Sequence, residues 1–228
     1  MEKTDQEKSP IEYLKSVDTP TISNAIEMLK LRPRSDGFTP LQVRCLFPEM
    51  GVLCGYAVTA QVETVTLGAK AEEERFVELF EAVEKSPKPA VIAFQEIGGN
   101  TDCAVHSGEV MATIFSRLGG IGLVSDCAVR DIPEVRAMGF HYFARGVAAS
   151  HASFRIVRVG VPVQICGMAI QPQDILHGDQ NGLIQIPAEA LKGLPAAVDA
   201  IRTSERRLMD FTKNADFTAS QLRGRFLH

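Results

Sequence analysis

The sequence predicts an α/β protein built from layers of helices and sheet, and three observations lead to this prediction. Helical patterns open the chain, two apolar runs separated by a helical pattern lie in its middle, and another helical pattern follows a series of short strands. Buried strands that alternate with helices are typical of layered α/β folds. A length of 228 residues suits one domain, or one domain with a helical appendage, and no internal repeat is found, so we expect a single domain over residues 1–228.

The first ordered elements are expected to be helices within residues 10–31. Apolar residues recur at helical spacing from residue 11 to residue 17. A second helix is predicted to start in the segment Thr19-Pro20-Thr21-Ile22-Ser23, with Thr or Ser as its cap and Pro in its first turn. Residues 1–9 are polar, and we expect them to be disordered.

Strands and helices alternate in the middle of the chain. Residues 52–65 are rich in β-branched residues and predict one or two strands. Residues 72–83 have the pattern of an amphipathic helix. Apolar runs at 90–94 and 121–124 predict two buried strands, with a helix at 108–118 between them.

Short elements fill the remainder. A short helix is predicted at 134–138, and the C-terminal part is expected to be a helical extension over 194–228. Four more strands and a further helical segment are predicted at 141–145, 154–159, 163–166, 184–187 and 188–191.

Composition excludes some classes of partner. The net charge is -4 and the isoelectric point is about 5.8, so the chain lacks the basic footprint of a nucleic-acid-binding protein. No apolar run approaches the ~20 residues that a membrane-spanning helix needs. We therefore expect neither a nucleic acid nor a membrane as a partner. An anionic substrate would require a local cation on this acidic protein.

Cysteine usage and the N-terminus indicate a reducing compartment. The chain has five cysteines, an odd number, and none of them form a C-x-x-C pair, which argues against a disulfide framework or a zinc knuckle. The N-terminal segment MEKTDQEKSPIEYL is charged and lacks the apolar core of a secretory signal. We expect the protein to be cytoplasmic.

The stretch from Gly98 to Gly146 carries the candidate chemistry. A glycine-rich loop leads into a helix at Ser107-Gly108-Glu109, and the free N–H groups of a helix N-terminus can bind a carboxylate. Arg130 and Asp131 follow a buried strand, where ligand sites of α/β sheets commonly lie. Each feature also has an ordinary explanation: a strand-to-helix turn for the loop and a solvated ion pair for the Arg-Asp dipeptide.

The residue types suit a metal and an oxo acid. An aspartate is a hard oxygen ligand for Mg²⁺ or Mn²⁺, and an arginine offers fixed donors for a carbonyl or carboxylate oxygen. Glu109 could hold a water molecule or accept a proton, although a carboxylate at this position is also favoured by the helix dipole alone. His106, three residues before Glu109, could form a zinc pair with it or line the pocket, but no third ligand is indicated.

The arrangement Glu109-x20-Arg130-Asp131 resembles the D/E-x20-R-D motif of the RraA-like family, which includes class II 4-hydroxy-4-methyl-2-oxoglutarate aldolases and RraA proteins named as regulators of RNase E. The similarity extends over roughly residues 20–190. Further segments that resemble the family are Phe143-Ala144-Arg145-Gly146, Val161-Pro162-Val163 with Gly167, Pro172-x-Asp174, Asp179, Gly182-Leu183-Ile184 and Pro187.

This resemblance implies a role for each matching residue. Asp131 would be the direct metal ligand, and Arg130 would bind the 2-oxo oxygen of the substrate and stabilise the enolate. Glu109 would hold metal-bound water and help relay a proton. The amides from Ser107 to Met111 (Ser107, Gly108, Glu109, Val110 and Met111) would bind the substrate's C1 carboxylate. The implied enzyme is a Mg²⁺- or Mn²⁺-dependent lyase that releases pyruvate from a 4-hydroxy-2-oxo acid and also decarboxylates oxaloacetate.

The resemblance also implies a layered α/β/β fold of the swivelling type, with flanking N- and C-terminal helices, assembled as a homotrimer or homohexamer. In the aldolases a neighbouring subunit lends an acidic residue to the site, for which Glu205 is a candidate. Cys127 and Gln173 depart from the family pattern, where glycine is usual, and Cys127 could narrow the pocket or reorient the loop. The alternative functions are that of a non-catalytic regulator that binds a protein such as a ribonuclease, and that of a related enzyme that acts on another oxo acid or a sugar acid.

Overall fold

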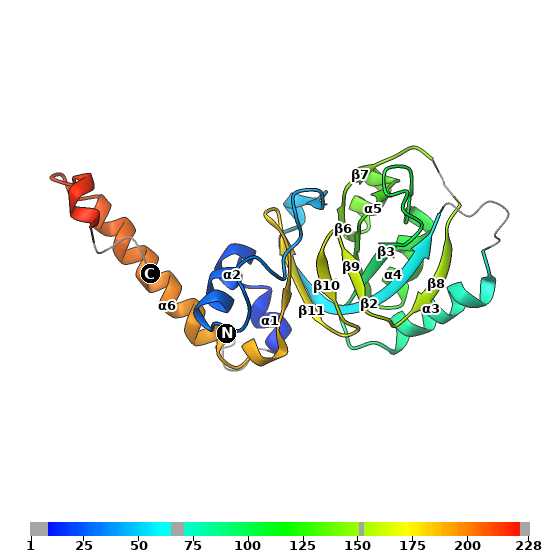
Figure 1. Cartoon of the computed structure of the whole chain (residues 1–228), viewed down its shortest axis with the longest axis horizontal. Coiled ribbons are helices and arrows are strands. Elements are labelled where there is room, and N and C mark those ends of the chain that lie inside the picture. Colours follow the sequence, from blue (N-terminus) through cyan, green and yellow to red (C-terminus); the bar gives the residue numbers. More distant parts are fainter. Residues whose placement is uncertain (1–8, 65–70, 151–152, 224–228) are drawn as a thin grey trace.

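A mixed sheet of eight strands forms the centre of the computed structural model, which describes residues 9–64, 71–150 and 153–223 (Figure 1). Strands β2, β3, β4 and β6 run parallel to one another, whereas the pairings with the outer strands are antiparallel. In order across the sheet the strands are β1 (Arg44–Cys45), β6 (His141–Ala144), β4 (Gly120–Ser125), β3 (Ala90–Glu96), β2 (Leu53–Glu63), β11 (Ile175–Asp179) and β12 (Gly182–Ile186), with β8 (Arg155–Val159) pairing with β2 as well.

The sheet is covered on both faces because alternate side chains of each strand point to opposite sides. In β3, Ile92 and Phe94 belong to one hydrophobic cluster, whereas Val91 and Ala93 belong to another. The first cluster lies under helices α3 (Glu73–Lys85), α4 (Glu109–Arg117) and α5 (Ile132–Ala137), and the second lies under the hairpin of β9 (Val163–Ile165) and β10 (Met168–Ile170).

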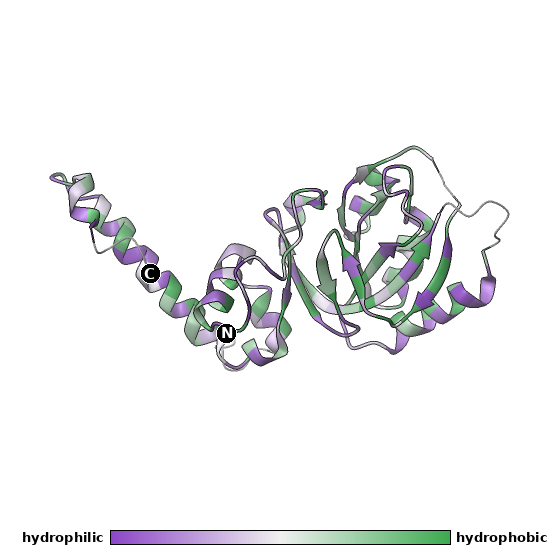
Figure 2. Ribbon diagram, viewed as in Figure 1, coloured by the Kyte–Doolittle hydropathy of each residue, from purple (hydrophilic) through white to green (hydrophobic). Residues whose placement is uncertain are grey.

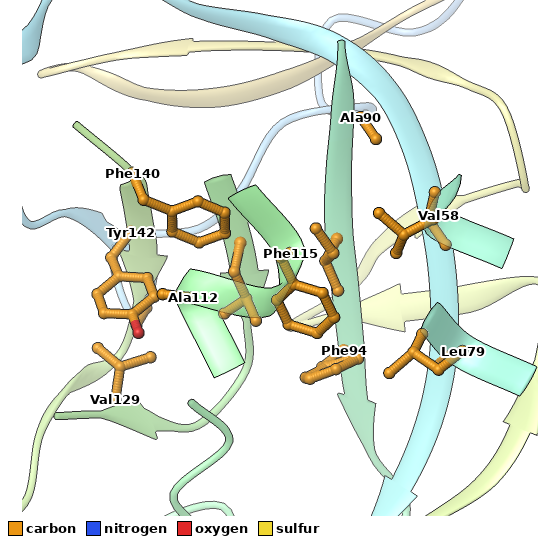
Figure 3. Packing of buried hydrophobic residues seen from close by; sticks show 14 of the residues in the cluster. Val58, Leu79, Ala90, Phe94, Ala112, Phe115, Val129, Phe140 and Tyr142 are labelled. Carbon is orange, nitrogen blue, oxygen red and sulfur yellow. The ribbon is translucent and has the colours of Figure 1, made fainter. Parts of the chain in front are cut away.

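The core under the helices fixes the position of α4. Ala112 and Phe115 are its buried residues, and the ring of Phe115 packs edge-on against Phe94 of β3 at a centroid distance of 6.1 Å. Figure 3 shows these two rings between Leu79 and the pair formed by Phe140 and Tyr142. The N-terminus of α4 is therefore held at the carboxyl end of the parallel strands.

Three further helices pack together beyond the β11–β12 edge of the sheet. They are α1 (Pro10–Leu14), α2 (Thr19–Met28) and α6 (Leu194–Thr212), and they share a hydrophobic cluster with β11 and β12. The C-terminal half of α6 projects away from the body (Figure 1), and hydrophilic and hydrophobic residues alternate along it (Figure 2). The short 3-10 helices are Pro48–Met50, Ala188–Ala190 and Ala219–Leu222.

The N-terminal helices differ from the prediction in their caps. Asp18, not a Thr or Ser, caps α2 by accepting a hydrogen bond from the backbone N–H of Thr21 at 2.9 Å. Ser9 is ordered because it forms a capping box with Glu12 at the start of α1. The remainder of the expected disordered segment, residues 1–8, lies outside the described residues.

The sequence did not predict five strands: β1, β5 (Ala128–Val129), β7 (Gly146–Val147), β10 and β11. In β11 the polar residues His177 and Asp179 interrupt the apolar pattern. Both are buried because α1 and α2 supply their partners: Thr19 donates its backbone N–H to Asp179 at 2.9 Å, and the His177 ring contacts the Leu14 carbonyl at 3.0 Å. These partners are distant in sequence, so the local pattern could not reveal the strand.

Gln173, at a position where the family resemblance implies glycine, has a φ of 70°, a left-handed conformation that glycine adopts at less cost. Within the described part of the chain, no helix has the length and apolarity to cross a bilayer.

Candidate functional site

The candidate residues come from two loops at the carboxyl ends of β3 and β4. One loop ends at Gly108, the N-cap residue of α4, and the other ends at Asp131, the N-cap residue of α5. Asp131 has φ 57° and ψ 47°, a left-handed conformation that aspartate tolerates better than most residues. This conformation turns the chain at the point where Pro133 allows α5 to begin.

The two loops are joined by hydrogen bonds. The backbone N–H of Glu109 donates to Oδ2 of Asp131 at 2.8 Å, and the backbone N–H of Arg130 donates to the Ser107 carbonyl at 2.9 Å. Nε of Arg130 lies 3.5 Å from the same Oδ2 of Asp131. The structure thus brings Ser107, Glu109, Arg130 and Asp131 together, as the sequence predicted.

Gly108 is the point of closest approach between the loops. A Cβ atom built on it would lie 2.3 Å from Oδ2 of Asp131 and 2.9 Å from Nε of Arg130. Every other residue carries a Cβ, so only glycine leaves room for both side chains at this position.

Ser107 is held by a hydrogen bond from a buried residue that the sequence did not single out. The hydroxyl of Tyr142, a buried residue of β6, donates to Oγ of Ser107 at 2.9 Å. Burial raises the pKa of Tyr142 to about 12, so its hydroxyl stays protonated and remains a donor. Tyr142 lies within a predicted strand, and no local signal distinguishes its hydroxyl from that of a surface tyrosine.

The side chains of the site differ in their exposure to solvent. Those of Arg130 and Asp131 are 32% and 33% exposed, and Glu109 is exposed. Val110 is 71% exposed and Met111 is half-buried, so both could contribute to the site through their backbone amides. The side chains of Arg130, Asp131 and Glu109 are therefore accessible from solvent.

The donor set of this site fits a hard divalent cation. Asp131 and Glu109 provide carboxylate oxygens, which Mg²⁺ and Mn²⁺ prefer, and Mg²⁺ usually retains several waters beside one or two carboxylates. Partial exposure of Asp131 leaves space for such waters. The residues present therefore fit the implied metal.

His106 does not line the surface of the site. It is fully buried, and its ring nitrogens contact Oγ of Ser125 at 2.8 Å and Oε2 of Glu96 at 3.1 Å. The zinc pair with Glu109 that the sequence left open is thus replaced by a contact with Glu96. Glu96 and Ser125 end the two buried strands β3 and β4, and a carboxylate two residues after an apolar run is a signal that could have identified Glu96.

Glu96, His106 and Cys127 form a second, buried group whose potential ligand atoms lie within 4.8 Å of one another. Burial raises the pKa of the Cys127 thiol, and the carboxylates of Asp126 and Glu96 raise it further. The thiol accordingly stays protonated and donates to Oδ1 of Asp126 at 3.5 Å. Cys127 is buried beneath the loops, so its thiol does not narrow the solvent-facing site.

Two other charged residues have structural contacts. Arg145 donates to Oγ1 of Thr101 and to the carboxylate of Asp102, the latter at 2.9 Å. Asp126 accepts the backbone N–H of Glu96 at 2.9 Å. Among the described residues, the ion pair of Arg130 is with Asp131 and not with Asp126.

Comparison with known proteins places this geometry in context. The model of the RraA-like family, described as Aldolase/RraA, matches residues 19–185. A putative 4-hydroxy-4-methyl-2-oxoglutarate aldolase of Halalkalibacterium halodurans is 34% identical over 107 residues, which are 46% of this chain and 49% of that protein. Protein DlpA of Legionella pneumophila is 30% identical over 128 residues, 55% of this chain but only 20% of that protein. The chain thus spans about half or less of the length of these relatives.

A solved structure shows the same fold. The structure of RraAS2 from Streptomyces coelicolor, described as an unusual member of the RNase ES inhibitor RraA protein family, superimposes with a TM-score of 0.66 at 22% identity. The superposition covers 94% of this chain and 100% of that one. The layered α/β arrangement with its flanking helices is therefore a known fold.

Proposed function

The chain belongs to the RraA-like family, and from this premise we propose that it is a divalent-metal-dependent lyase that cleaves a 4-hydroxy-2-oxo acid by a retro-aldol reaction and releases pyruvate. The observation that carries the proposal is that Glu109, Arg130 and Asp131 meet at the N-terminal end of α4. There the backbone N–H of Glu109 and Nε of Arg130 both lie against Oδ2 of Asp131. A protein that served only to bind a partner would have no need for two carboxylates and an arginine around one small-molecule site. The similarity to a putative aldolase supports the same activity.

Each residue of the site would perform one task. Asp131 would hold the metal, which supplies Lewis-acid stabilisation of negative charge when bound. The guanidinium of Arg130 would donate to the 2-oxo oxygen, where charge develops as the enolate forms. The backbone amides from Ser107 to Met111 would bind the C1 carboxylate of the substrate, except that of Glu109, which donates to Asp131.

Glu109 would serve the proton transfer. Retro-aldol cleavage removes a proton from the C4 hydroxyl, and the exposed carboxylate of Glu109 is free to orient a water or accept that proton. Decarboxylation of oxaloacetate leads to the same enolate without a base at C4. The same site would therefore support both reactions.

We further propose that the chain acts as a single domain within a homotrimer or homohexamer. Glu205 is exposed on α6, which projects away from the site of its own chain (Figure 1). It could contribute only to the site of another copy. Val110 and Val147, which are 71% and 61% exposed, lie on segments next to the site and are suited to burial against that copy.

The test is pyruvate release, coupled to lactate dehydrogenase, with oxaloacetate and 4-hydroxy-4-methyl-2-oxoglutarate as separate substrates. Mg²⁺, Mn²⁺ and EDTA are compared, and Arg130→Ala is expected to lower turnover by on the order of 10²–10³. Arg117→Ala is the matched control, because Arg117 is an exposed arginine at the other end of α4. It should retain the activity of the unmodified protein.

Absence of turnover of either compound by folded, metal-supplied protein would contradict the lyase proposal. The non-catalytic alternative, binding to a protein partner such as a ribonuclease, would then be tested by measuring ribonuclease inhibition directly.

A further inference from the structure

A buried hydrogen-bonded chain lies directly beneath the candidate site. Its members are Glu96 at the end of β3, His106 in the loop before α4 and Ser125 at the end of β4. All three are buried, and the side chains of Glu96 and His106 are completely inaccessible to solvent. Polar groups this deep are costly unless each has a partner.

The neighbouring donors and acceptors determine which group donates in each bond of this hydrogen-bonded chain. The backbone N–H of Cys127 donates to Oγ of Ser125 at 2.9 Å, so the Ser125 hydroxyl can donate its own proton to Nδ1 of His106, 2.8 Å away. The N–H group at Nε2 of His106 then donates to Oε2 of Glu96 at 3.1 Å. This single tautomer satisfies every polar atom of the three side chains.

Glu96 anchors the chain at its other end. Its carboxylate also accepts the backbone N–H groups of Gly98 at 2.8 Å and Thr64 at 3.1 Å. Burial acts to raise the pKa of Glu96, but the hydrogen bonds from His106, Thr64 and Gly98 outweigh it and hold the pKa below its ordinary value. Glu96 is therefore a carboxylate acceptor for His106.

The hydrogen-bonded chain of Glu96, His106 and Ser125 lies where the two loops of the site meet. The backbone N–H of His106 donates to the Ala128 carbonyl at 3.0 Å, and the adjacent Ser107 carbonyl accepts the N–H of Arg130 at 2.9 Å. The imidazole packs between Phe94 and Phe154, each with its ring centroid 5.9 Å away. Backbone hydrogen bonds thus join the loop before α4 to the loop after β4, and the His106 side chain ties this junction to Glu96 and Ser125 at the ends of β3 and β4.

We propose that His106 is a positioning residue whose bonds to Glu96 and Ser125 hold the Ser107–Glu109 segment in register with Arg130 and Asp131. It would touch no reacting atom, and its effect on catalysis rests on the proposed function. The backbone N–H of Glu109 lies 2.8 Å, and Nε of Arg130 lies 3.5 Å, from Oδ2 of Asp131. A small relative shift of the two loops would therefore separate these groups.

Two substitutions separate hydrogen bonding from packing. His106→Phe keeps an aromatic ring between Phe94 and Phe154 but leaves Glu96 and Ser125 without their partner. His106→Gln provides an amide N–H that can restore the bond to Glu96. The primary measurement is native-state hydrogen exchange by NMR on the complete protein without substrate, which does not depend on any lyase activity.

In His106→Phe the amides of Ala128 and Arg130 should exchange at least about tenfold faster, as the loss of a buried hydrogen bond implies, while amides of β2 change less. His106→Gln should recover part of this protection. In the coupled assay, kcat/KM should fall about tenfold in His106→Phe and be partly recovered in His106→Gln. Unchanged exchange in the two loops, or an equal increase in β2, would overturn the proposal.

If His106→Phe does not fold, Ser125→Ala provides the second test. It removes the hydroxyl that links His106 to Cys127 and should raise exchange at Ala128 and Arg130 in the same way. Measurement of bound metal addresses the cluster of Glu96, His106 and Cys127. One equivalent of metal that is retained in Asp131→Asn but lost in His106→Phe would overturn the hydrogen-bonded chain in favour of a buried metal site. Loss of kcat/KM without any change in exchange would equally contradict a positioning role.

Discussion

The backbone N–H of Glu109 donates a 2.8 Å hydrogen bond to Oδ2 of Asp131, so the proposed metal ligand also caps the helix proposed to bind the substrate. Asp131 itself belongs to the start of the next helix, α5. The carboxylate at the start of α5 therefore accepts a hydrogen bond from an N–H in the first turn of α4 that has no acceptor within its own helix. The helix dipole favours negative charge at this position. The two proposed binding functions, for metal and for carboxylate, are coupled through one oxygen atom.

Asp131→Asn separates the charge of this residue from its capping role. The amide oxygen of asparagine can still accept the Glu109 N–H, so the free energy of unfolding should change by less than about 1 kcal/mol, the usual value of a cap. Mg²⁺ affinity, measured by calorimetry, should fall by more than about tenfold because a neutral oxygen replaces a carboxylate. The exposed Asp102→Asn is the control. Equal Mg²⁺ affinity in Asp131→Asn and the unmodified protein would show that Asp131 is not the ligand.

Gly108→Ala should inactivate the site without unfolding the protein. The new methyl group would lie 2.3 Å from Oδ2 of Asp131 and 2.9 Å from Nε of Arg130, and both side chains would have to move. We expect kcat/KM for pyruvate release to fall by about 100-fold or more, since small displacements of catalytic groups have effects of this size.

Gly146→Ala is the matched control for this substitution. Gly146 lies in β7 and does not have a positive φ, and in the described part of the chain no atom beyond its chain neighbours would lie within 4 Å of a Cβ at this position. Its activity should match that of the unmodified protein. Similar losses in both variants would indicate a general effect of added methyl groups and not a collision within the site.

Glu109→Gln should distinguish the two proposed reactions. Retro-aldol cleavage requires proton transfer from the C4 hydroxyl, and loss of an acid–base group typically costs about 10²–10⁴ in rate. Decarboxylation of oxaloacetate requires no such base, so its rate should change by much less. Both rates are measured by pyruvate release at saturating metal. Equal losses in the two reactions would assign Glu109 to binding and not to proton transfer.

His141 predicts a dependence of stability on pH. Burial, together with the smaller effect of the nearby charge of Lys15, lowers the pKa of His141 to about 4. Among the described residues, its Nδ1 has no hydrogen-bond partner. An unfolded histidine titrates near its ordinary value of ~6.5, so below that pH the unfolded chain binds more protons than the folded one.

The contribution of neutral His141 to stability is therefore complete above pH ~6.5 and is lost as the pH falls toward ~4, at up to about 1.4 kcal/mol per pH unit. Urea unfolding of the unmodified protein and of His141→Phe across this range gives the measurement. As the pH falls, the free energy of unfolding of the unmodified protein should decrease relative to that of His141→Phe. A difference that is constant with pH would show that His141 titrates normally in the folded state.

Much of the fold follows from local sequence patterns. Apolar runs identified β3 and β4, helical spacing identified α3 and α4, and the positions of Gly108 and Arg130 relative to these elements indicated one site at the carboxyl ends of the strands. This is possible because burial of one face imposes a period of two on strands and of about 3.6 on helices. The roles proposed for Asp131, Arg130 and Glu109 rest on their residue types and on the resemblance of their spacing to a family motif.

What only the tertiary structure decided is which polar groups meet in the interior. The partners of His177 lie more than 150 residues away in the sequence, His106 faces Glu96 instead of Glu109, and Tyr142 supports Ser107 across 35 residues. A buried polar side chain is stable only with a partner, and that partner is supplied by whichever segments the fold brings together. Sequence alone determined the elements and the residues capable of chemistry. Packing determined their contacts, because a hydrogen bond depends on distances of a few tenths of an ångström that no local pattern specifies.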